Sequence, residues 1–185
     1  MENERSGFSV IEVALVLAIA GLIFLMVFIA LPSLRRSQRD TSRREDVMKL
    51  VSEIKNYQTN NGRGRLPGSS DTIPDSGKLI VKGASGNNTS WAGFYRDFLG
   101  DKFVDPDGES YKLMIVECSA EDTDKECAAA PLNSLYSKNF TENDYKMYVV
   151  LGSTCYGEKS IASNNQRRVS VLYKLEGSGI YCDNT

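Results

Sequence analysis

The chain of 185 residues contains no histidine at all. This absence removes the side chain that most often acts as a general base near neutral pH, and the one that most often binds transition metals. An active site would have to use carboxylates, lysine, tyrosine, serine or cysteine, and the sequence shows no nucleophile motif. We therefore expect no enzymatic activity, no bound metal and no other cofactor.

The chain also lacks a strong excess of charge of either sign. It has 22 Lys and Arg against 24 Asp and Glu, a formal net charge of −2. This balance gives no overall attraction to nucleic acid or to anionic lipid. Arg63 and Arg65, in a loop with Trp91 nearby, could contact DNA, although a solvated loop is the simpler interpretation.

Polar residues are missing from one long segment. Residues 13–31 (VALVLAIAGLIFLMVFIAL) include no charged or strongly polar side chain. A helix of this length would be about 28 Å long, close to the hydrocarbon thickness of a bilayer. A buried helix of a soluble domain normally has a polar face, which this segment lacks. The segment is therefore predicted to span a membrane.

The residues before this segment differ from an ordinary secretory signal, in which the small residues of the cleavage site follow the apolar stretch. Here Ser6 and Gly7 come before the stretch, and Phe8 opens it. Cleavage after Gly7 would remove the short leader and keep the helix. It would also create a new α-amino group on Phe8, four residues before Glu12.

Glu12 stands at the start of the apolar helix. A carboxylate driven toward the centre of a bilayer costs about 2.5–3.5 kcal/mol, so Glu12 is expected to have a partner. No Lys or Arg follows within one helical turn. The new amino group of Phe8, in the same chain or in a neighbouring subunit, is the candidate. The alternative is that Glu12 only lies among the lipid headgroups.

The string GFSVIEVALVLAI (residues 7–19) resembles the leader junction and N-terminal helix of type IV pilins and pseudopilins. This resemblance implies that a dedicated peptidase cuts after Gly7 and that the new N-terminus, Phe8, is methylated. It also implies that Glu12 pairs with the N-terminus of an adjacent subunit during assembly. The motif covers the N-terminal part of the chain, and the remainder matches the family only in general plan.

Two features depart from the family. Leaders in the family are usually rich in Lys and Arg, whereas MENERSG has Glu2 and Glu4 against Arg5. The basic residues that flank the apolar segment lie mostly after it, and the positive-inside rule alone would place the C-terminal part in the cytoplasm. Neighbouring acidic residues dilute this basic cluster and the cysteines favour an oxidising compartment, so we expect the C-terminal part outside. The basic residues are Arg35, Arg36, Arg39, Arg43 and Arg44.

Helical spacing continues beyond Pro32. One apolar stripe is predicted to pack against later strands, whereas the arginines of residues 36–44 fall largely elsewhere on the surface. Asn60, Asn61 and Gly62 form a helix stop. The stripe consists of Val47, Leu50, Val51, Ile54 and Tyr57.

Gly21 and Pro32 weaken helical structure in the apolar part. The family resemblance implies that this part melts and stretches in an assembled filament. The alternative is that Gly21 lets neighbouring helices approach closely. The chain as a whole is predicted to contain a cleaved leader (1–7), a transmembrane or filament-core helix (8–32), an amphipathic helix (33–61) and a globular head (62–185).

The remaining sequence predicts a small α+β domain. Residues 62–93 read as a long loop with a short strand at Lys78–Lys82, followed by a short helix at Trp91–Leu99. Three strands are predicted from alternating and β-branched residues: Tyr111–Val116, Tyr145–Leu151 and Val169–Leu175. We expect the long N-terminal helix to pack on an antiparallel sheet of three to four strands, which is also the plan of pilin heads. Asp105-Pro106-Asp107-Gly108 is expected to form a turn rather than a cation site.

The four cysteines are Cys118, Cys127, Cys155 and Cys182. They show no C-x-x-C spacing, and without histidine a zinc site is not expected. An even number of cysteines in an exported domain indicates two disulfides. Pairing of neighbours, Cys118 with Cys127 and Cys155 with Cys182, is the simplest arrangement. The other two connectivities stay open on spacing alone.

Together with these observations, the resemblance to type IV pilins predicts a structural subunit of a type IV pilus. The subunit would wait in the cytoplasmic membrane as a single-pass protein and then enter an extracellular filament. Expected partners are further copies of the chain, a prepilin peptidase, a pilus assembly platform, and surfaces, host cells or DNA. The alternative is a pseudopilin of a type II secretion or competence system. A single-pass membrane enzyme is a third hypothesis, which a binding cleft in the head would support.

Overall fold

The computed structural model describes residues 7–61, 63–69, 71–119, 125–137, 145–177 and 179–185. All of the predicted leader except Gly7 lies outside these residues. The chain divides into two compact units, Met1–Gln38 and Arg39–Thr185. We call them the N-terminal unit and the globular unit.

One helix, α1, extends over Val10–Asn60 and passes without interruption through Gly21 and Pro32. Its end agrees with the predicted stop, because the Asn61 N–H donates to the Tyr57 carbonyl at 2.9 Å. Arg63 and Gly64 then adopt left-handed backbone angles, with φ of 48° and 81°. This conformation commonly terminates helices and turns the chain away from the helix axis.

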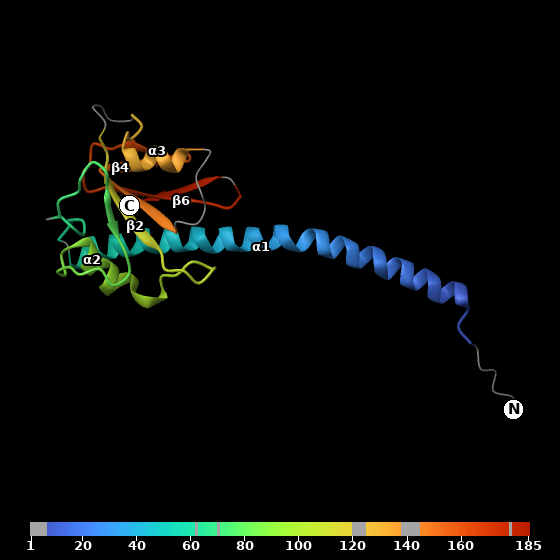
Figure 1. The fold of residues 1–185 in the computed structure, drawn as a ribbon. Coiled ribbons are helices and arrows are strands. Elements are labelled where there is room, and N and C mark those ends of the chain that lie inside the picture. Colours follow the sequence, from blue (N-terminus) through green and yellow to red (C-terminus); the bar gives the residue numbers. More distant parts are fainter. Residues whose placement is uncertain (1–6, 62, 70, 120–124, 138–144, 178) are drawn as a thin grey trace. The chain divides into compact units, whose positions relative to one another are not determined.

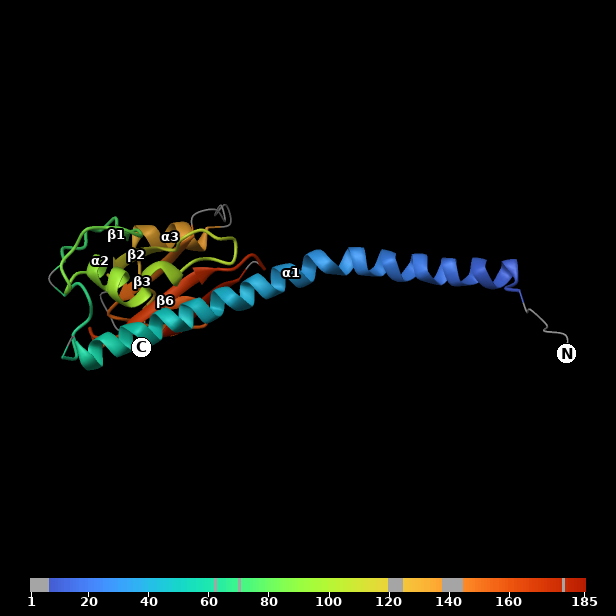
Figure 2. The ribbon, with the colours of Figure 1, turned by 90° about the horizontal axis from the view of Figure 1, so that it is seen from below.

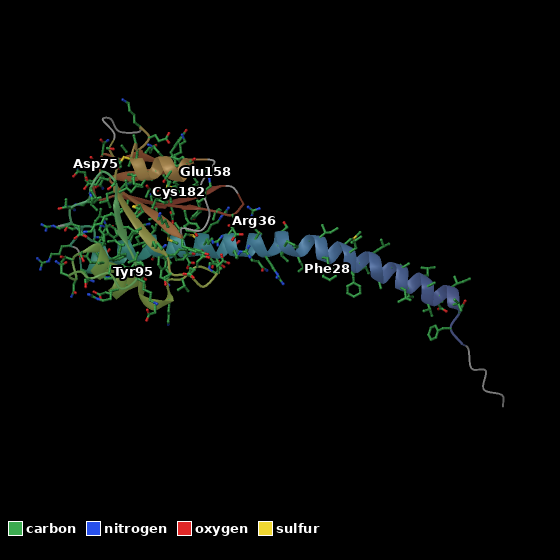
Figure 3. The ribbon with its side chains drawn as sticks, in the orientation of Figure 1. Phe28, Arg36, Asp75, Tyr95, Glu158 and Cys182 are labelled. Atoms are coloured by element: carbon green, nitrogen blue, oxygen red, sulfur yellow. A yellow bond between two sulfur atoms is a disulfide. The ribbon has the colours of Figure 1, made fainter. Side chains whose placement is uncertain are left out.

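The N-terminal unit buries none of its large apolar side chains. Between Val13 and Leu31 their exposed fraction ranges from 38% at Leu31 to 72% at Met26. Figure 3 shows Phe28 projecting outward from the helix, and 71% of its surface is exposed. By length and composition, α1 is the one helix among the described residues that could cross a membrane.

The globular unit contains a five-stranded sheet with the order β1-β2-β3-β6-β7. The strands are Lys78–Ile80 (β1), Lys112–Glu117 (β2), Lys146–Leu151 (β3), Val169–Lys174 (β6) and Ile180–Asn184 (β7). The α+β class is confirmed, and four of these strands overlap predicted ones. The fifth, β7, was missed because it is a half-buried edge strand without a clear alternation of apolar and polar residues.

One neighbouring pair in this sheet departs from the antiparallel expectation. Strands β2 and β3 run parallel, with Ile115 opposite Val149, while the other neighbours are antiparallel. Parallel strands need a long crossover. The segment between β2 and β3 supplies it and contains a helix, α3 (Ala130–Tyr136), that was not predicted. Pro131 at its start and the spacing of Leu132 and Leu135 are the signals that were available.

Two helices cover the two faces of the sheet, so the sheet is buried on both sides (Figure 1). The apolar stripe of α1 is confirmed: Val47, Leu50 and Ile54 are fully buried in the larger core. Leu132 and Leu135 of α3 are buried in a second core on the opposite face. Figure 2 shows α1 and α3 on opposite sides of β3 and β6 from a second direction. Burial of both faces explains why β3 and β6 read as almost continuous apolar runs.

Short elements complete the globular unit. The predicted helix at Trp91–Leu99 consists of an α-helical turn, α2 (Trp91–Phe94), and a π-helical turn, η1 (Tyr95–Leu99), followed by the 3-10 turn η2 (Gly100–Lys102). A second sheet is the hairpin of β4 (Ser153–Tyr156) and β5 (Lys159–Ala162).

Candidate functional site

The first candidate site lies at the start of α1. Gly7 and Phe8 precede the helix and are exposed, and Glu12 lies exposed in its first turn. A methyl group added at Gly7 would meet no atom within 4 Å. The described part of the fold therefore does not require glycine at position 7.

A second interpretation of Glu12 comes from the helix itself. The Val13 N–H donates to the Ser9 carbonyl at 3.2 Å, which places Ser9 at the N-cap and Glu12 three residues later. Ser-x-x-Glu is the spacing of a capping box, in which Gln serves as well as Glu. A carboxylate in the first turn also stabilises the helix dipole. Glu12 thus has a local role available in addition to the expected pairing with a subunit.

A group of buried charges lies where α1 enters the globular unit. Arg43, with 4% of its surface exposed, donates two hydrogen bonds to the fully buried Asp105 carboxylate, at 2.8 and 2.9 Å. It donates further hydrogen bonds to Asp107 at 2.9 Å and to Glu176. The Tyr173 hydroxyl donates to Asp105 at 3.2 Å. A buried guanidinium with this many partners fixes the loop and the sheet to one position along α1.

Two further residues of α1 extend this group, which we call the ion cluster. Arg39 donates two hydrogen bonds to Glu176, at 2.8 and 2.6 Å. Asp40 accepts from the backbone N–H groups of Glu176 and Gly177, both at 2.9 Å. The ion cluster comprises Arg39, Asp40, Arg43, Asp105, Asp107 and Glu176 and joins α1 to the turn before β2 and to the end of β6.

The pKa values in the ion cluster reflect this pairing. Burial raises the pKa of the Asp105 carboxyl, but hydrogen bonds from Arg43 and from the Asp107 N–H outweigh burial and hold it below its ordinary value. The pKa of Glu176 is lowered to about 2, chiefly by the hydrogen bond from Arg39 and, against the effect of burial, by Arg43. Both carboxylates are therefore ionised at neutral pH and compensate the two guanidiniums.

Sequence reasoning missed the ion cluster because it placed Arg43 on the surface together with its neighbours. A signal was present: Arg43 precedes Val47 by four residues and Leu50 by seven, so it lies on the same helical stripe as the buried residues. The turn at residues 105–108 was predicted and is confirmed, with the Gly108 N–H donating to the Asp105 carbonyl at 2.8 Å. The function of its carboxylates as partners of an arginine was not predicted.

Two disulfides close parts of the globular unit. Cys118 is joined to Cys127 and Cys155 to Cys182, and no described cysteine is free. The second bridge connects β4 to the edge strand β7 (Figure 3). In the chain-entropy description, a loop of this size stabilises the folded state by about 3–4 kcal/mol. The bridge thus holds an edge strand that has little buried area of its own.

Two adjoining hollows near the C-terminal end of α1 include exposed cations among their lining residues. They have volumes of 430 Å³ and 560 Å³ and share Arg167. Arg167 lies beside Gly64, where an added methyl group would be 3.1 Å from a guanidinium nitrogen. We call the two hollows the basic groove, and its cations are Lys55, Arg63, Arg65, Arg167 and Arg168.

Arg63, Arg65 and Trp91 do not form the shared DNA-contacting surface that the sequence suggested. Both arginines are exposed, but Trp91 is fully buried, with its ring 5.7 Å from that of Phe94. The tryptophan cannot stack on a nucleic-acid base. The cations that accompany the two arginines come instead from α1 and from the β5–β6 connection.

The part of the chain that the structure describes contains no group of three or more His, Cys, Asp and Glu side chains placed to hold a metal ion. The basic groove is a cleft with two carboxylates, Asp71 and Glu117, in one hollow and cations without Asp or Glu in the other. The second hollow suits an anion, since guanidiniums favour carboxylates and phosphates.

No protein-family model, curated protein or solved structure matches the chain.

Proposed function

We propose that the chain is a structural subunit of a type IV pilus: it is processed by a prepilin peptidase and polymerises through α1 into a surface filament. The observation that carries this proposal is the coincidence of three features in the N-terminal unit. These are Gly7 in front of an exposed Phe8, one carboxylate at Glu12, and an apolar helix that the chain itself leaves uncovered.

An uncovered helix of this kind needs an apolar environment. Each fully buried large apolar side chain contributes about 1.5–3 kcal/mol relative to water, so leaving more than ten of them in water is strongly unfavourable. A bilayer provides that environment before assembly, and the helices of other copies provide it in a filament. The same surface therefore serves two states of the subunit.

Glu12 supplies the register of assembly in this proposal. In the membrane it lies near the headgroups; in the filament it meets the amino group that cleavage creates on Phe8 of a neighbouring subunit. A buried charge left without its partner typically costs about 3–5 kcal/mol. A subunit added out of register would carry that penalty, and a subunit added in register would not.

The globular unit supplies the outer surface of the filament and remains outside the membrane. Its two disulfides suit an oxidising compartment. Repetition of this surface along a filament would let weak contacts with surfaces, host cells or DNA act together.

The experiment is to shear filaments from cells that produce the chain and to determine the N-terminal peptide by mass spectrometry. We expect the chain in the filaments, beginning with a methylated Phe8. Gly7→Val should instead accumulate as full-length precursor in the membrane, because the added side chain obstructs the peptidase and not the fold.

A chain that begins at Met1 in the filaments, or a Gly7→Val variant that matures normally, would contradict the proposed processing. A processed chain that stays in the membrane of cells without surface filaments would favour the pseudopilin of a secretion or competence system.

A further inference from the structure

The five cations of the basic groove are all exposed, and none of them forms an ion pair with a carboxylate of the described chain. By contrast, Arg39, Arg43, Lys78, Lys82, Arg96 and Lys159 each form one. The hollow around Arg65 also has two carboxylates, Asp71 and Glu117, in its lining, whereas the hollow with Lys55, Arg63, Arg167 and Arg168 has neither Asp nor Glu. In a protein with a net charge of −2, this second hollow is a local concentration of positive charge.

The opposite excess lies around the ion cluster. Together with Glu109 that region holds five carboxylates against the guanidiniums of Arg39 and Arg43. Glu109 is exposed and forms no ion pair with any described residue, and the Asp107 side chain is 41% exposed although it contacts Arg43. Both acidic side chains project from the turn between Asp105 and Glu109, whose backbone is fixed by the Asp105 N–H donating to the Glu109 carbonyl at 2.7 Å.

These two charged regions lie far apart in the globular unit. Arg43 anchors the acidic turn, and Gln58, which lines the basic groove, comes fifteen positions later in α1, or about 22 Å along the helix. The two regions therefore do not neutralise each other within one chain. They are also different surfaces, so a contact between them joins two copies head to tail.

We infer that the basic groove of one subunit receives the acidic turn, Asp107 to Glu109, of the next subunit along the filament. This inference rests on the proposed function and names the contact between globular units that assembly would form. A heterologous contact of this kind leaves one free end of each type after every addition, so it extends an open polymer rather than closing a dimer. Opposite charge at the two ends also aligns the incoming subunit before the apolar helices pack.

The backbone of the groove supports a fixed receptor for a turn. Arg63 has a left-handed φ of 48°, which is uncommon for a residue with a side chain. The Gly64 N–H donates to the Gln58 carbonyl at 2.7 Å, and the Gln58 side chain donates to the Arg167 carbonyl at 2.9 Å. These bonds connect the loop of Arg63 and Arg65 to the segment of Arg167 and Arg168, so the cations from α1, the loop and the β5–β6 connection are held side by side.

The test is charge reversal in the full-length chain, with filaments counted on cells. Arg168→Glu and Glu109→Arg should each reduce the number of filaments by about fivefold or more, because each places like charges across the contact. Lys82→Glu is the control: it reverses one exposed cation outside the groove, whose surface ion pair with Asp101 contributes little, and it should leave the number within about twofold. The chain carrying both Arg168→Glu and Glu109→Arg restores opposite charges and should recover most of the filaments.

Normal filament numbers in Arg168→Glu, or a double variant as poor as the single ones, would overturn the inference. Arg168→Glu could also lower filament number through misfolding. A second variant covers this case: Glu109→Cys combined with Arg168→Cys should give covalent multimers in oxidised filaments, and monomers alone would overturn the contact.

Two other outcomes are informative. Arg168→Glu filaments that are normal in number but no longer retain labelled duplex DNA would make the groove a nucleic-acid site and overturn the subunit contact. A wild-type chain that is absent from filaments would contradict the proposed function itself. If the wild-type chain does assemble, the charge-reversal results test only the contact between subunits.

Discussion

The two units of this chain use the same helix in opposite ways. In the globular unit, α1 has a buried stripe and a polar remainder; in the N-terminal unit it is apolar on all sides and buries none of its large side chains. The glycines differ in the same manner. A methyl group at Gly93 would lie 2.1 Å from the Asn87 carbonyl oxygen, whereas at Gly7 or Gly21 it would meet nothing within 4 Å.

This difference separates two kinds of constraint on the sequence. Residues of the globular unit are explained by contacts within the chain, such as the packing of Leu50 or the hydrogen bonds of Arg43. The apolar residues of the N-terminal unit have no such contacts in the described chain, and in the proposed function lipid and other copies of the chain supply them.

The largest effect is expected from Arg43→Met. This change keeps much of the volume of the side chain but leaves the buried Asp105 without its guanidinium, and breaking a buried ion pair in this way costs about 3–5 kcal/mol. The matched control is the neighbouring Arg44→Met, which removes an exposed cation 5.6 Å from the Tyr181 ring and should cost about 1 kcal/mol or less.

The free energy of unfolding can be followed by urea denaturation of the detergent-solubilised chain. Trp91 is the only tryptophan and lies buried in the globular unit, so its fluorescence reports that unit alone. If Arg43→Met and Arg44→Met lowered the free energy of unfolding equally, the ion cluster would not be what holds the turn and the sheet against α1.

The next test compares two leucines of α1, one in the globular unit and one in the N-terminal unit. Leu50→Ala opens a cavity in the larger core and should lower the free energy of unfolding by about 2–5 kcal/mol. Leu25→Ala should change it by less than about 0.5 kcal/mol, since Leu25 is 58% exposed. The same Trp91 signal measures both. A large effect of Leu25→Ala on that signal would remove the distinction between the two units.

Acid should weaken the globular unit through its paired carboxylates. Asp105 and Glu176 have lowered pKa values in the folded protein, so their stabilisation is complete above the unfolded values near about pH 4 and is lost as the pH falls toward about 2. Burial raises the pKa of Asp46, which acts in the opposite direction and offsets part of the loss.

The urea midpoint should therefore fall between about pH 4.5 and pH 2, and the fall should be smaller in Glu176→Gln. Glu158→Gln, which changes an exposed carboxylate, is the control and should behave as the wild type. An unchanged pH dependence in Glu176→Gln would mean that the pairing with Arg39 and Arg43 contributes nothing measurable.

Periodicity predicted the parts of the fold in which one face is apolar. The stripe of α1 follows from it, because burial of one face imposes a period of 3.6 on a helix. Strands β3 and β6 were located as apolar runs, although both of their faces are buried and the expected alternation of buried and exposed residues is absent. Helix α3 was missed because it is only seven residues long. Without a crossover helix between them, strands β2 and β3 were not expected to pair in parallel.

The ion cluster was beyond the reach of the same reasoning for a different reason. A charged residue is usually exposed, so the position of Arg43 on the apolar stripe had less weight than its charge. Its partners Asp105 and Glu176 are distant in sequence, and only the fold brings them together. At the N-terminus, Gly7, Phe8 and Glu12 were selected from sequence, but their expected partners are other molecules, and the pairing stays a prediction.

The central claim is that Glu12 acts between subunits, and Glu12→Gln tests it most directly. Glutamine preserves the capping-box pattern with Ser9 and leaves the Gly7–Phe8 bond unchanged, so helix formation and processing should be normal. It removes the charge that would neutralise the Phe8 amino group in a filament. We predict mature Glu12→Gln chains in the membrane and at least about a tenfold loss of filaments, the minimum expected for one unpaired buried charge. Normal numbers of filaments built from the Glu12→Gln chain would contradict the account and leave Glu12 as a helix cap.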